Sequence, residues 1–207
     1  MSTTGTDPDR RLDAARSVVG PEVAVLPGGS AEAVMTAAPE VVVAIGPFTN
    51  LHRWWAPRMP PVPVVAMGGA LAPVTHRGEE RTVETNVGLD PEAASWLFGS
   101  GGAVTLVPLD VTAAMVVSAD EQARLSAVVP GLRAALDGWP HALCLHDPLA
   151  VLVALGDVAA TKTARRLSVS PDGIVSDGDG FPSVTVVIDA DIEGARTRAV
   201  EVSTAPM

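Results

Sequence analysis

The sequence predicts an α/β protein of three layers, in which a mainly parallel, doubly wound sheet lies between helices. Two apolar runs carry this prediction. Val41–Ile45 contains four β-branched residues and ends at Gly46, and Val62–Met67 ends at Gly68. Such runs are typical of strands buried on both faces, like the inner strands of a parallel sheet. Helical segments alternate with strand-like ones along the chain, which favours parallel strands joined by helices.

Length and composition indicate one domain. The chain has 207 residues, of which 47% are hydrophobic. We expect residues 10–207 to form a single domain behind a flexible tail at Met1–Asp9. No apolar run approaches the ~18 residues that a membrane span needs, and the polar start does not resemble a signal peptide. We therefore expect a soluble, cytoplasmic protein with no membrane partner.

Charge and cysteine content exclude several kinds of partner and site. Acidic residues outnumber basic ones by 24 to 14, for a net charge of −10, and the arginines do not cluster. Nucleic-acid binding needs a basic face, so we expect none. Cys144 is the single cysteine, which excludes an internal disulfide and a zinc cluster of cysteines. It fits a small buried residue better than a nucleophile.

The N-terminal half is predicted to alternate helices and strands. Ser30 suits the cap of the helix that leads into the central strand, and Pro57 ends a short helix after it. The expected elements are a helix over 10–19, a strand over 23–26, a helix over 30–38, a strand over 41–45, a helix over 51–56 and a strand over 62–67.

The C-terminal half continues this alternation. Asp90-Pro91 and Asp147-Pro148 each combine a capping residue with a first-turn proline, and Pro171-Asp172 predicts a hairpin turn. The expected elements are a polar loop over 70–83, a helix over 90–98, a strand over 104–108, helices over 118–129, 132–136 and 149–155, hairpin strands over 166–170 and 173–176, a strand over 183–188 and a helix over 191–202. In such a sheet a ligand pocket lies beyond the carboxyl ends of the strands, here beside Ile45, Gly46, Met67 and Gly68.

Five stretches, in this order, resemble the inosine-uridine type nucleoside hydrolases. They are AIGPFTNL (44–51), VVAMGGAL (64–71), ETNVGLDPEAA (84–94), VTLVPLDVT (104–112) and LHDPLAV (145–151), within a likeness that covers residues 16–202. The resemblance implies a doubly wound α/β fold in which bound calcium activates water to cleave the N-glycosidic bond of a nucleoside.

The resemblance also assigns roles in a substrate pocket. Glu84 and Asn86 match the pair that binds ribose hydroxyls, and Thr85 stands between them where the family has an aromatic residue. Met67 matches a residue near the sugar. His146 matches the histidine near the base, which can act as an acid toward the leaving group.

The calcium site of the family is the main departure. Asp147 matches a calcium ligand, and Ile45 a residue whose backbone carbonyl binds the metal. The family's aspartate cluster, which supplies most ligands and the general base, has no counterpart on an apolar strand. Residues 7–14 could alternatively be a degenerate copy of this cluster. This alternative is disfavoured because the preceding MSTTGT cannot form a buried strand. Since calcium takes about six to eight oxygens, we expect an N-terminally shortened domain without metal or cofactor.

Several candidates also have a structural interpretation. Asp90 and Asp147 fit helix caps. Glu84 and Asn86 have the same parity along an extended segment, so both side chains are expected to face one pocket; the alternative is a solvated loop. His146, at a helix start beside a carboxylate, is either a packed histidine or a proton-transfer group.

The sequence favours an enzyme that acts on a polar or ribosyl-like small molecule, with His146 as acid or base and autonomous calcium-dependent hydrolysis lost. One alternative is a subunit of a composite N-ribohydrolase whose partner chain supplies the aspartate cluster. Another is a non-catalytic binding subunit. A shortened sheet would expose an edge at Val41–Ile45, and Trp54 and Trp55 follow it, filling the core or an interface. We therefore expect a homodimer or a partner chain.

Overall fold

The computed structural model describes residues 34, 36, 38–128, 132–136, 141–179 and 183–204. The predicted tail over 1–9, helix over 10–19 and strand over 23–26 lie outside the described residues, as does most of the helix over 30–38. In the described part of the chain, no helix combines the length and the apolar content that a membrane crossing requires.

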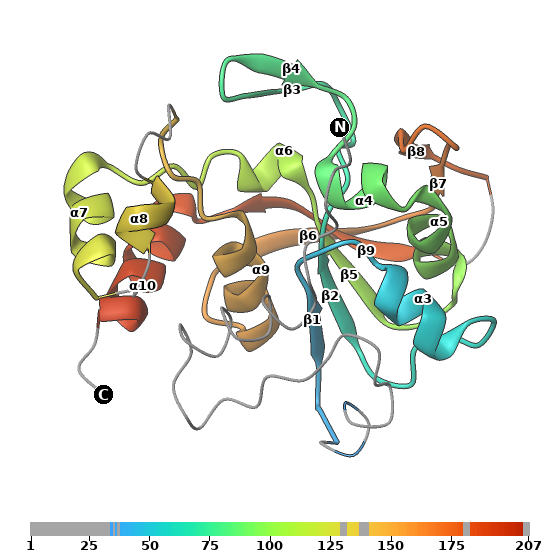
Figure 1. Cartoon of the computed structure of the whole chain (residues 1–207). Coiled ribbons are helices and arrows are strands. Elements are labelled where there is room, and N and C mark those ends of the chain that lie inside the picture. Colours follow the sequence, from blue (N-terminus) through green and yellow to red (C-terminus); the bar gives the residue numbers. More distant parts are fainter. Residues whose placement is uncertain are drawn as a thin grey trace, which may run out of the picture.

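A five-stranded sheet forms the centre of the fold (Figure 1). Its strands are β1 (Val42–Ala44), β2 (Val64–Met67), β5 (Val104–Val107), β6 (Ala160–Arg165) and β9 (Val184–Ala190). The spatial order is β1-β2-β5-β9-β6; the first four strands are parallel, and β6 runs antiparallel to β9. Val64 lies beside both Val42 and Val104, so the carboxyl ends of β1, β2 and β5 meet at one edge of the sheet.

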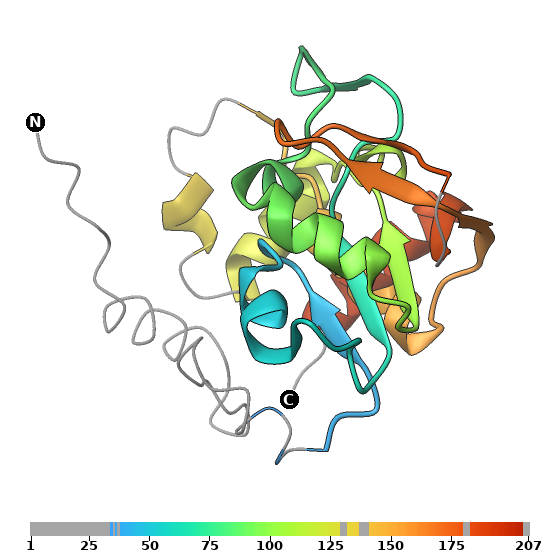
Figure 2. The ribbon, with the colours of Figure 1, turned by 90° about the vertical axis from the view of Figure 1, so that its right-hand side faces the viewer.

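Helices cover both faces of the sheet (Figures 1 and 2). One face carries α3 (Thr49–Trp55), α4 (Thr85–Leu89) and α5 (Pro91–Gly99). The other face carries α6 (Leu109–Thr112), α7 (Ala119–Val128), α8 (Leu132–Leu136), α9 (His146–Leu155) and α10 (Ile192–Thr204). The observed architecture is thus the predicted three-layer α/β fold with a mainly parallel sheet.

Strand β2 shows why the sheet separates two cores. All four of its residues are buried, and successive side chains point to opposite faces. Val65 and Met67 belong to the core that includes α9 and α10, whereas Val64 and Ala66 belong to the core that includes α3 and α5. The second strand predicted from the sequence is therefore buried on both faces.

The prediction for the first strand was wrong in part. β1 covers three residues rather than 41–45, and each of them is only half-buried. In the described part of the chain β1 pairs with β2 on one side alone. Its side chains pack toward both cores, but a strand at the end of the sheet keeps one edge less covered than an inner strand does.

Both paired tryptophans pack with the core of this chain. Trp55 is buried in the core beside α5, and Trp54 packs edge-on against it with ring centroids 6.1 Å apart. Trp55 therefore contributes to the core of this chain, which removes it as a support for an interface.

The predicted polar loop over 70–83 is in fact a hairpin that projects beyond the end of β2 (Figure 1). Its strands are β3 (Val74–His76) and β4 (Glu79–Arg81), which pair antiparallel. The two turn residues, Arg77 and Gly78, have φ angles of 55° and 79°. A two-residue turn with positive φ at both positions matches the twist of the strands, which explains why the chain pairs here.

Near the C-terminus the predicted hairpin is present, and one strand was missed. The hairpin consists of β7 (Leu167–Val169) and β8 (Val175–Asp177). Sequence reasoning missed β6, because most of its side chains are polar or exposed and its pairing with β9 lies far along the chain.

Candidate functional site

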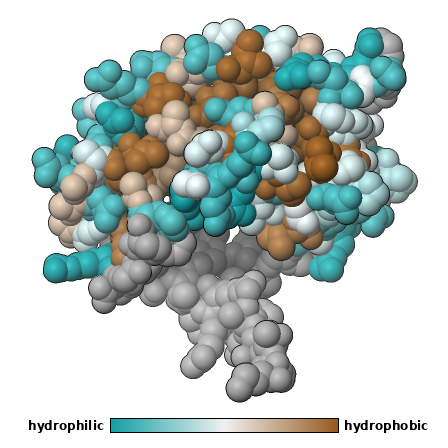
Figure 3. Space-filling model, turned by 90° about the horizontal axis from the view of Figure 1, so that it is seen from above, coloured by the Kyte–Doolittle hydropathy of each residue, from teal (hydrophilic) through white to brown (hydrophobic). Residues whose placement is uncertain are grey.

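A cavity of about 480 Å³ lies at the carboxyl ends of β1, β2 and β5, beside the β3–β4 hairpin. This volume is within the range of small-molecule sites. Figure 3 views the molecule from the hairpin side, where hydrophobic patches are interrupted by hydrophilic residues. All six residues proposed from the sequence line the cavity: Met67, Glu84, Thr85, Asn86, His146 and Asp147. Ile45 also lines it, as expected from its place after β1.

Glu84 is a buried helix cap rather than a residue of an extended segment. Its side chain is 5% exposed and stands at the N-cap of α4. The carboxylate accepts hydrogen bonds from the backbone N–H groups of Gly69, Asn86 and Val87, at 2.9–3.1 Å. The expectation that Glu84 and Asn86 share a face through extended parity was therefore wrong. The helical turn brings both residues to the cavity by a different geometry.

Asn86 joins α4 to the end of β2. Its Nδ2 donates to the backbone oxygen of Met67 at 3.0 Å and lies 3.6 Å from the Met67 sulfur. These contacts fix the amide plane and leave Oδ1 without a hydrogen bond in the described residues. The Asn86 side chain can thus offer an acceptor to a ligand in the cavity.

His146 is the first residue of α9, and Thr112 holds its ring. Nδ1 lies 2.9 Å from Oγ1 of Thr112, which is fully buried at the end of α6. Burial, together with the smaller effect of the positive charges of His76 and Arg77, lowers the pKa of His146 to about 4. The imidazole is therefore neutral near pH 7, which suits a proton acceptor better than a proton donor.

Asp147 is not the helix cap that its Asp-Pro sequence predicts. Leu145 occupies the cap position of α9, and Asp147 lies within the first turn. Burial raises the pKa of the Asp147 carboxyl, and the nearby charge of Glu84 raises it further. Asp147 is thus a partly buried acid beside the cavity, and within the described residues its side chain accepts no hydrogen bond.

Two other aspartates have structural roles, and that of Asp90 was predicted from its place before Pro91. Asp90 caps α5 by accepting from the N–H of Ala93 at 3.0 Å, and it also accepts a hydrogen bond from the Thr49 hydroxyl. Asp110 accepts from the N–H groups of Leu71 and Ala72 at 2.8 and 3.0 Å. Neither residue is among those lining the cavity.

Sequence reasoning did not foresee that the hairpin contributes to the site. His76, Arg77 and Arg81 all line the cavity. The His76 ring meets the His146 ring edge-on, with centroids 4.8 Å apart. Burial lowers the pKa of His76, and Arg77 and Arg81 lower it further. The dipeptide Arg77-Gly78 was the available signal for a hairpin turn. Arginine is uncommon at positive φ, so the sequence did not indicate a turn there.

Cys144 is a protonated, buried thiol. Its Sγ donates to the backbone oxygen of Thr112 at 3.3 Å and lies 3.8 Å from Nδ1 of His146. Burial raises its pKa to about 11, so the thiol form predominates at neutral pH. Nucleophilic catalysis needs the thiolate, which disfavours that role for Cys144.

The described residues do not fit a calcium ion of the kind that the resemblance implies. Glu84 and Asp147 are the acidic residues among the cavity lining, and backbone N–H groups already occupy the Glu84 carboxylate. Asp147 and the Ile45 carbonyl remain, whereas calcium takes about six to eight oxygen ligands. No step of the chemistry proposed below depends on calcium.

Comparison with known proteins adds a family match. A family model described as inosine-uridine preferring nucleoside hydrolase matches residues 4–203, a span that starts before the resemblance noted in the sequence. No curated protein matches the chain.

Solved structures resemble the chain in fold. A purine-preferring ribonucleoside hydrolase from Gardnerella vaginalis is 24% identical with a TM-score of 0.66, over 84% of this chain and 66% of that one. A plant nucleoside hydrolase is 23% identical with a TM-score of 0.68, over 80% and 62%. An inosine-uridine preferring nucleoside hydrolase from Bacillus anthracis is 21% identical with a TM-score of 0.65, over 88% and 67%. At these identities the likeness establishes the fold alone.

Proposed function

Because this chain belongs to the inosine-uridine preferring nucleoside hydrolase family, we propose that its cavity binds a polar, ribosyl-like small molecule and that His146 transfers a proton there. One observation carries the proposal. Residues from three separate segments, at the end of β2, at the start of α4 and at the start of α9, line one cavity. Open α/β sheets bind their ligands at this edge.

The polar groups of the cavity suit such a ligand. The Oδ1 of Asn86 offers an acceptor to a sugar hydroxyl, and Thr85 supplies a second polar side chain. Met67 provides an apolar surface beside them. Glu84 acts indirectly in this proposal, because its carboxylate positions Asn86 through the N–H groups of α4.

His146 is proposed to work as a base at neutral pH. Because its pKa is low, the imidazole is neutral and one ring nitrogen is free to accept a proton. The contact with Thr112 fixes the ring orientation. Asp147, the next residue, supplies a carboxyl beside the ligand. The chain would carry out this chemistry without calcium-dependent hydrolysis of its own.

Binding and turnover test the proposal on the full chain. Ribose, inosine and uridine are titrated by calorimetry, and release of the base is followed by chromatography. We expect binding that weakens about tenfold or more in Asn86→Ala, because a ligand hydroxyl loses its partner. Any turnover is expected to disappear in His146→Ala. His52→Ala is the matched control, because His52 stacks on Trp96 away from this cavity. No binding of any of the three compounds, or equal binding by Asn86→Ala, would overturn the proposal.

A second candidate is a subunit of a composite N-ribohydrolase. Asp147 favours it, because a half-buried carboxyl without a hydrogen bond within the described residues is suited to a cation held partly by another chain. On this hypothesis the chain alone binds no calcium in the micromolar range, and calorimetric titration with calcium checks that expectation. Release of base from inosine by the chain and calcium alone would exclude the need for a partner.

A further inference from the structure

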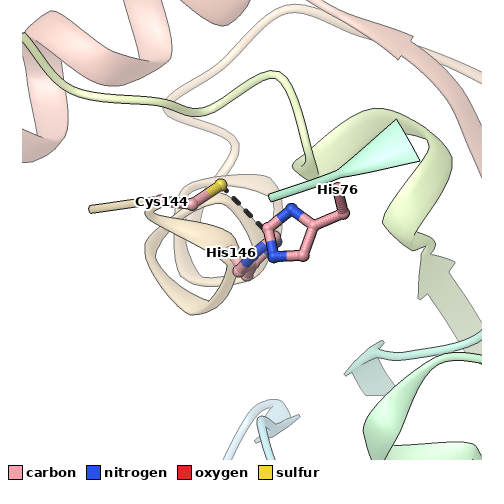
Figure 4. A group of neighbouring side chains, drawn as sticks. All are labelled: His76, Cys144 and His146. Carbon is pink, nitrogen blue, oxygen red and sulfur yellow. Dashed lines mark hydrogen bonds between the residues drawn. The ribbon is translucent and has the colours of Figure 1, made fainter. Parts of the chain in front are cut away.

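Three side chains with metal-binding atoms gather at one wall of the cavity (Figure 4). His76 ends β3, Cys144 precedes α9, and His146 is the first residue of that helix. One ligand atom from each residue lies within 4.8 Å of the other two. Cys144 and His146 are two residues apart, whereas His76 is far from them in the sequence and the hairpin brings it to the pair.

The type of ligand indicates the type of metal. Imidazole nitrogen and thiolate sulfur bind zinc at about 2.0–2.1 and 2.3 Å, whereas calcium prefers oxygen. Tetrahedral zinc at these distances separates its ligand atoms by roughly 3.3–3.6 Å. The three ligand atoms lie within 4.8 Å of one another, so the set must contract by about 1 Å to hold such an ion. His76, on a partly exposed hairpin, is the ligand most able to move.

In the metal-free protein, Thr112 holds two of the three ligands in place. Its hydroxyl lies 2.9 Å from Nδ1 of His146, and its backbone oxygen accepts from the Cys144 thiol at 3.3 Å. Metal-binding histidines are usually oriented in this way by a hydrogen bond to the other ring nitrogen. With Nδ1 engaged by Thr112, Nε2 of His146 is the nitrogen left for a metal.

We propose that His76, Cys144 and His146 form a site for a divalent transition metal of the zinc type. Three protein ligands would leave a fourth position for water or a ligand oxygen, and all three residues line the cavity. This site uses none of the family's aspartate ligands and goes beyond the proposed function. The proton transfer proposed for His146 therefore belongs to the metal-free chain, and the metal site is a separate state of the same cavity.

The local charge partly opposes and partly favours a cation. Arg77 and Arg81 lie near His76, and their positive charges repel a metal cation. Metal binding would displace the proton of the Cys144 thiol to solvent, together with its hydrogen bond to the Thr112 backbone oxygen, so that the sulfur contributes one negative charge. Asp147 lies beside His146 on α9. The thiolate is therefore the ligand on which binding depends most.

Cobalt is the most informative probe, because its spectrum reports thiolate ligation and tetrahedral geometry directly. The full chain is freed of metal under reducing conditions and titrated with Co²⁺, and Zn²⁺ is then added in competition. We expect one equivalent to give a near-ultraviolet thiolate charge-transfer band and visible bands of tetrahedral cobalt, which zinc abolishes. No nucleoside is present, so failure here leaves the proposed function untouched.

Matched variants decide which residues bind the metal. Cys144→Ser, of similar size, is expected to lose the charge-transfer band, and His76→Gln to weaken binding by at least about tenfold. His52→Gln, outside the cavity, is expected to bind like the wild type. Circular dichroism confirms that each variant is folded. No cobalt band in the wild type, or a charge-transfer band that persists in Cys144→Ser, would overturn the proposal.

Discussion

At the scale of single residues, Glu84 combines a place in the cavity with a role in folding. Its buried carboxylate accepts from three backbone N–H groups, one of them on Gly69 in the segment after β2. Hydrogen bonds to charged groups contribute about 1.5–3 kcal/mol each, and the donors would remain buried. We therefore expect Glu84→Ala to lower the free energy of unfolding by about 2–4 kcal/mol.

Urea denaturation measures this loss. Glu80→Ala, at an exposed position of β4, is the control and is expected to change stability by less than about 0.5 kcal/mol. Glu84→Gln keeps an acceptor oxygen and should fall between the two. Equal stability of Glu84→Ala and Glu80→Ala would show that the cap does not stabilise the fold.

The low pKa of His146 has a defined consequence for stability. The folded-state pKa is about 4, and the ordinary value is 6.5. Between these values the unfolded chain binds more protons, so the free energy of unfolding falls as pH falls through this window. The contribution is complete above pH 6.5 and decreases by on the order of 3 kcal/mol toward pH 4.

Denaturation of the wild type and of His146→Gln at pH 7 and pH 5 isolates this effect. The wild type is expected to lose more stability on acidification than the variant. Asp147, whose pKa is raised, acts in the opposite direction but is present in both proteins. An NMR titration of the His146 ring with a midpoint near 6.5 would contradict the prediction.

At the scale of elements, the β7–β8 hairpin packs against α4 through a glycine contact. Gly173 has a φ of 82°, and a Cβ there would lie 2.9 Å from the Cα of Gly88 and 3.0 Å from a Val83 methyl group. Both the backbone angle and the lack of space require glycine. We expect Gly173→Ala to destabilise the protein by about 1–3 kcal/mol.

Thermal and urea denaturation test this prediction against Gly99→Ala. A Cβ at Gly99 meets nothing within 4 Å, and the residue ends α5. Alanine there should leave stability unchanged or raise it by up to about 1 kcal/mol. A Gly173→Ala variant as stable as Gly99→Ala would mean that the hairpin moves away from α4 without cost.

The elements also show how far local sequence determines this fold. The helix after Asp90 was predicted because its cap and proline act within one turn. β2 was predicted because a short run of apolar residues is stable mainly as a strand inside a core. By contrast, β6 and the β3–β4 hairpin depend on pairing with a distant strand and on the positive φ of Arg77, which no apolar pattern encodes.

The candidate site, too, was predictable from the sequence only in part. The resemblance identified residues that line one cavity, but it did not identify the contacts that place them. The hydrogen bond between Thr112 and His146 joins residues 34 positions apart, and the one from Gly69 to Glu84 spans 15 positions. Such partners are set by how α6 meets α9 and how α4 meets the end of β2, which local sequence patterns do not report.

At the scale of the whole molecule, the edge of β1 that pairs with no described strand predicts self-association. In the described residues β1 pairs only with β2, and the following Ile45 is 48% exposed. An apolar strand edge is stabilised by pairing with another chain, and a two-fold dimer covers both edges at once. We therefore expect a homodimer at micromolar concentration.

Light scattering gives the mass directly. We expect about twice the chain mass of 21.2 kDa, and a shift toward the single chain in Ile45→Lys. Ile188→Lys is the control, because Ile188 is equally exposed, at 49%, but belongs to β9. A wild type that scatters as one species of about 21 kDa would exclude dimerisation through this edge.

The order of strands in the sheet also determines how the chain must fold. Arg165 of β6 pairs with Val184 of β9 across a short segment, whereas Thr105 of β5 meets Thr185 of β9 only after 80 residues have closed into a loop. Closing the longer loop costs more entropy, and parallel pairing of distant strands slows folding. The β6–β9 pair is thus expected to form first and to join β5 late. Until that step, the apolar side chains of β5 and β9 are open to contacts between chains, and aggregation competes with refolding.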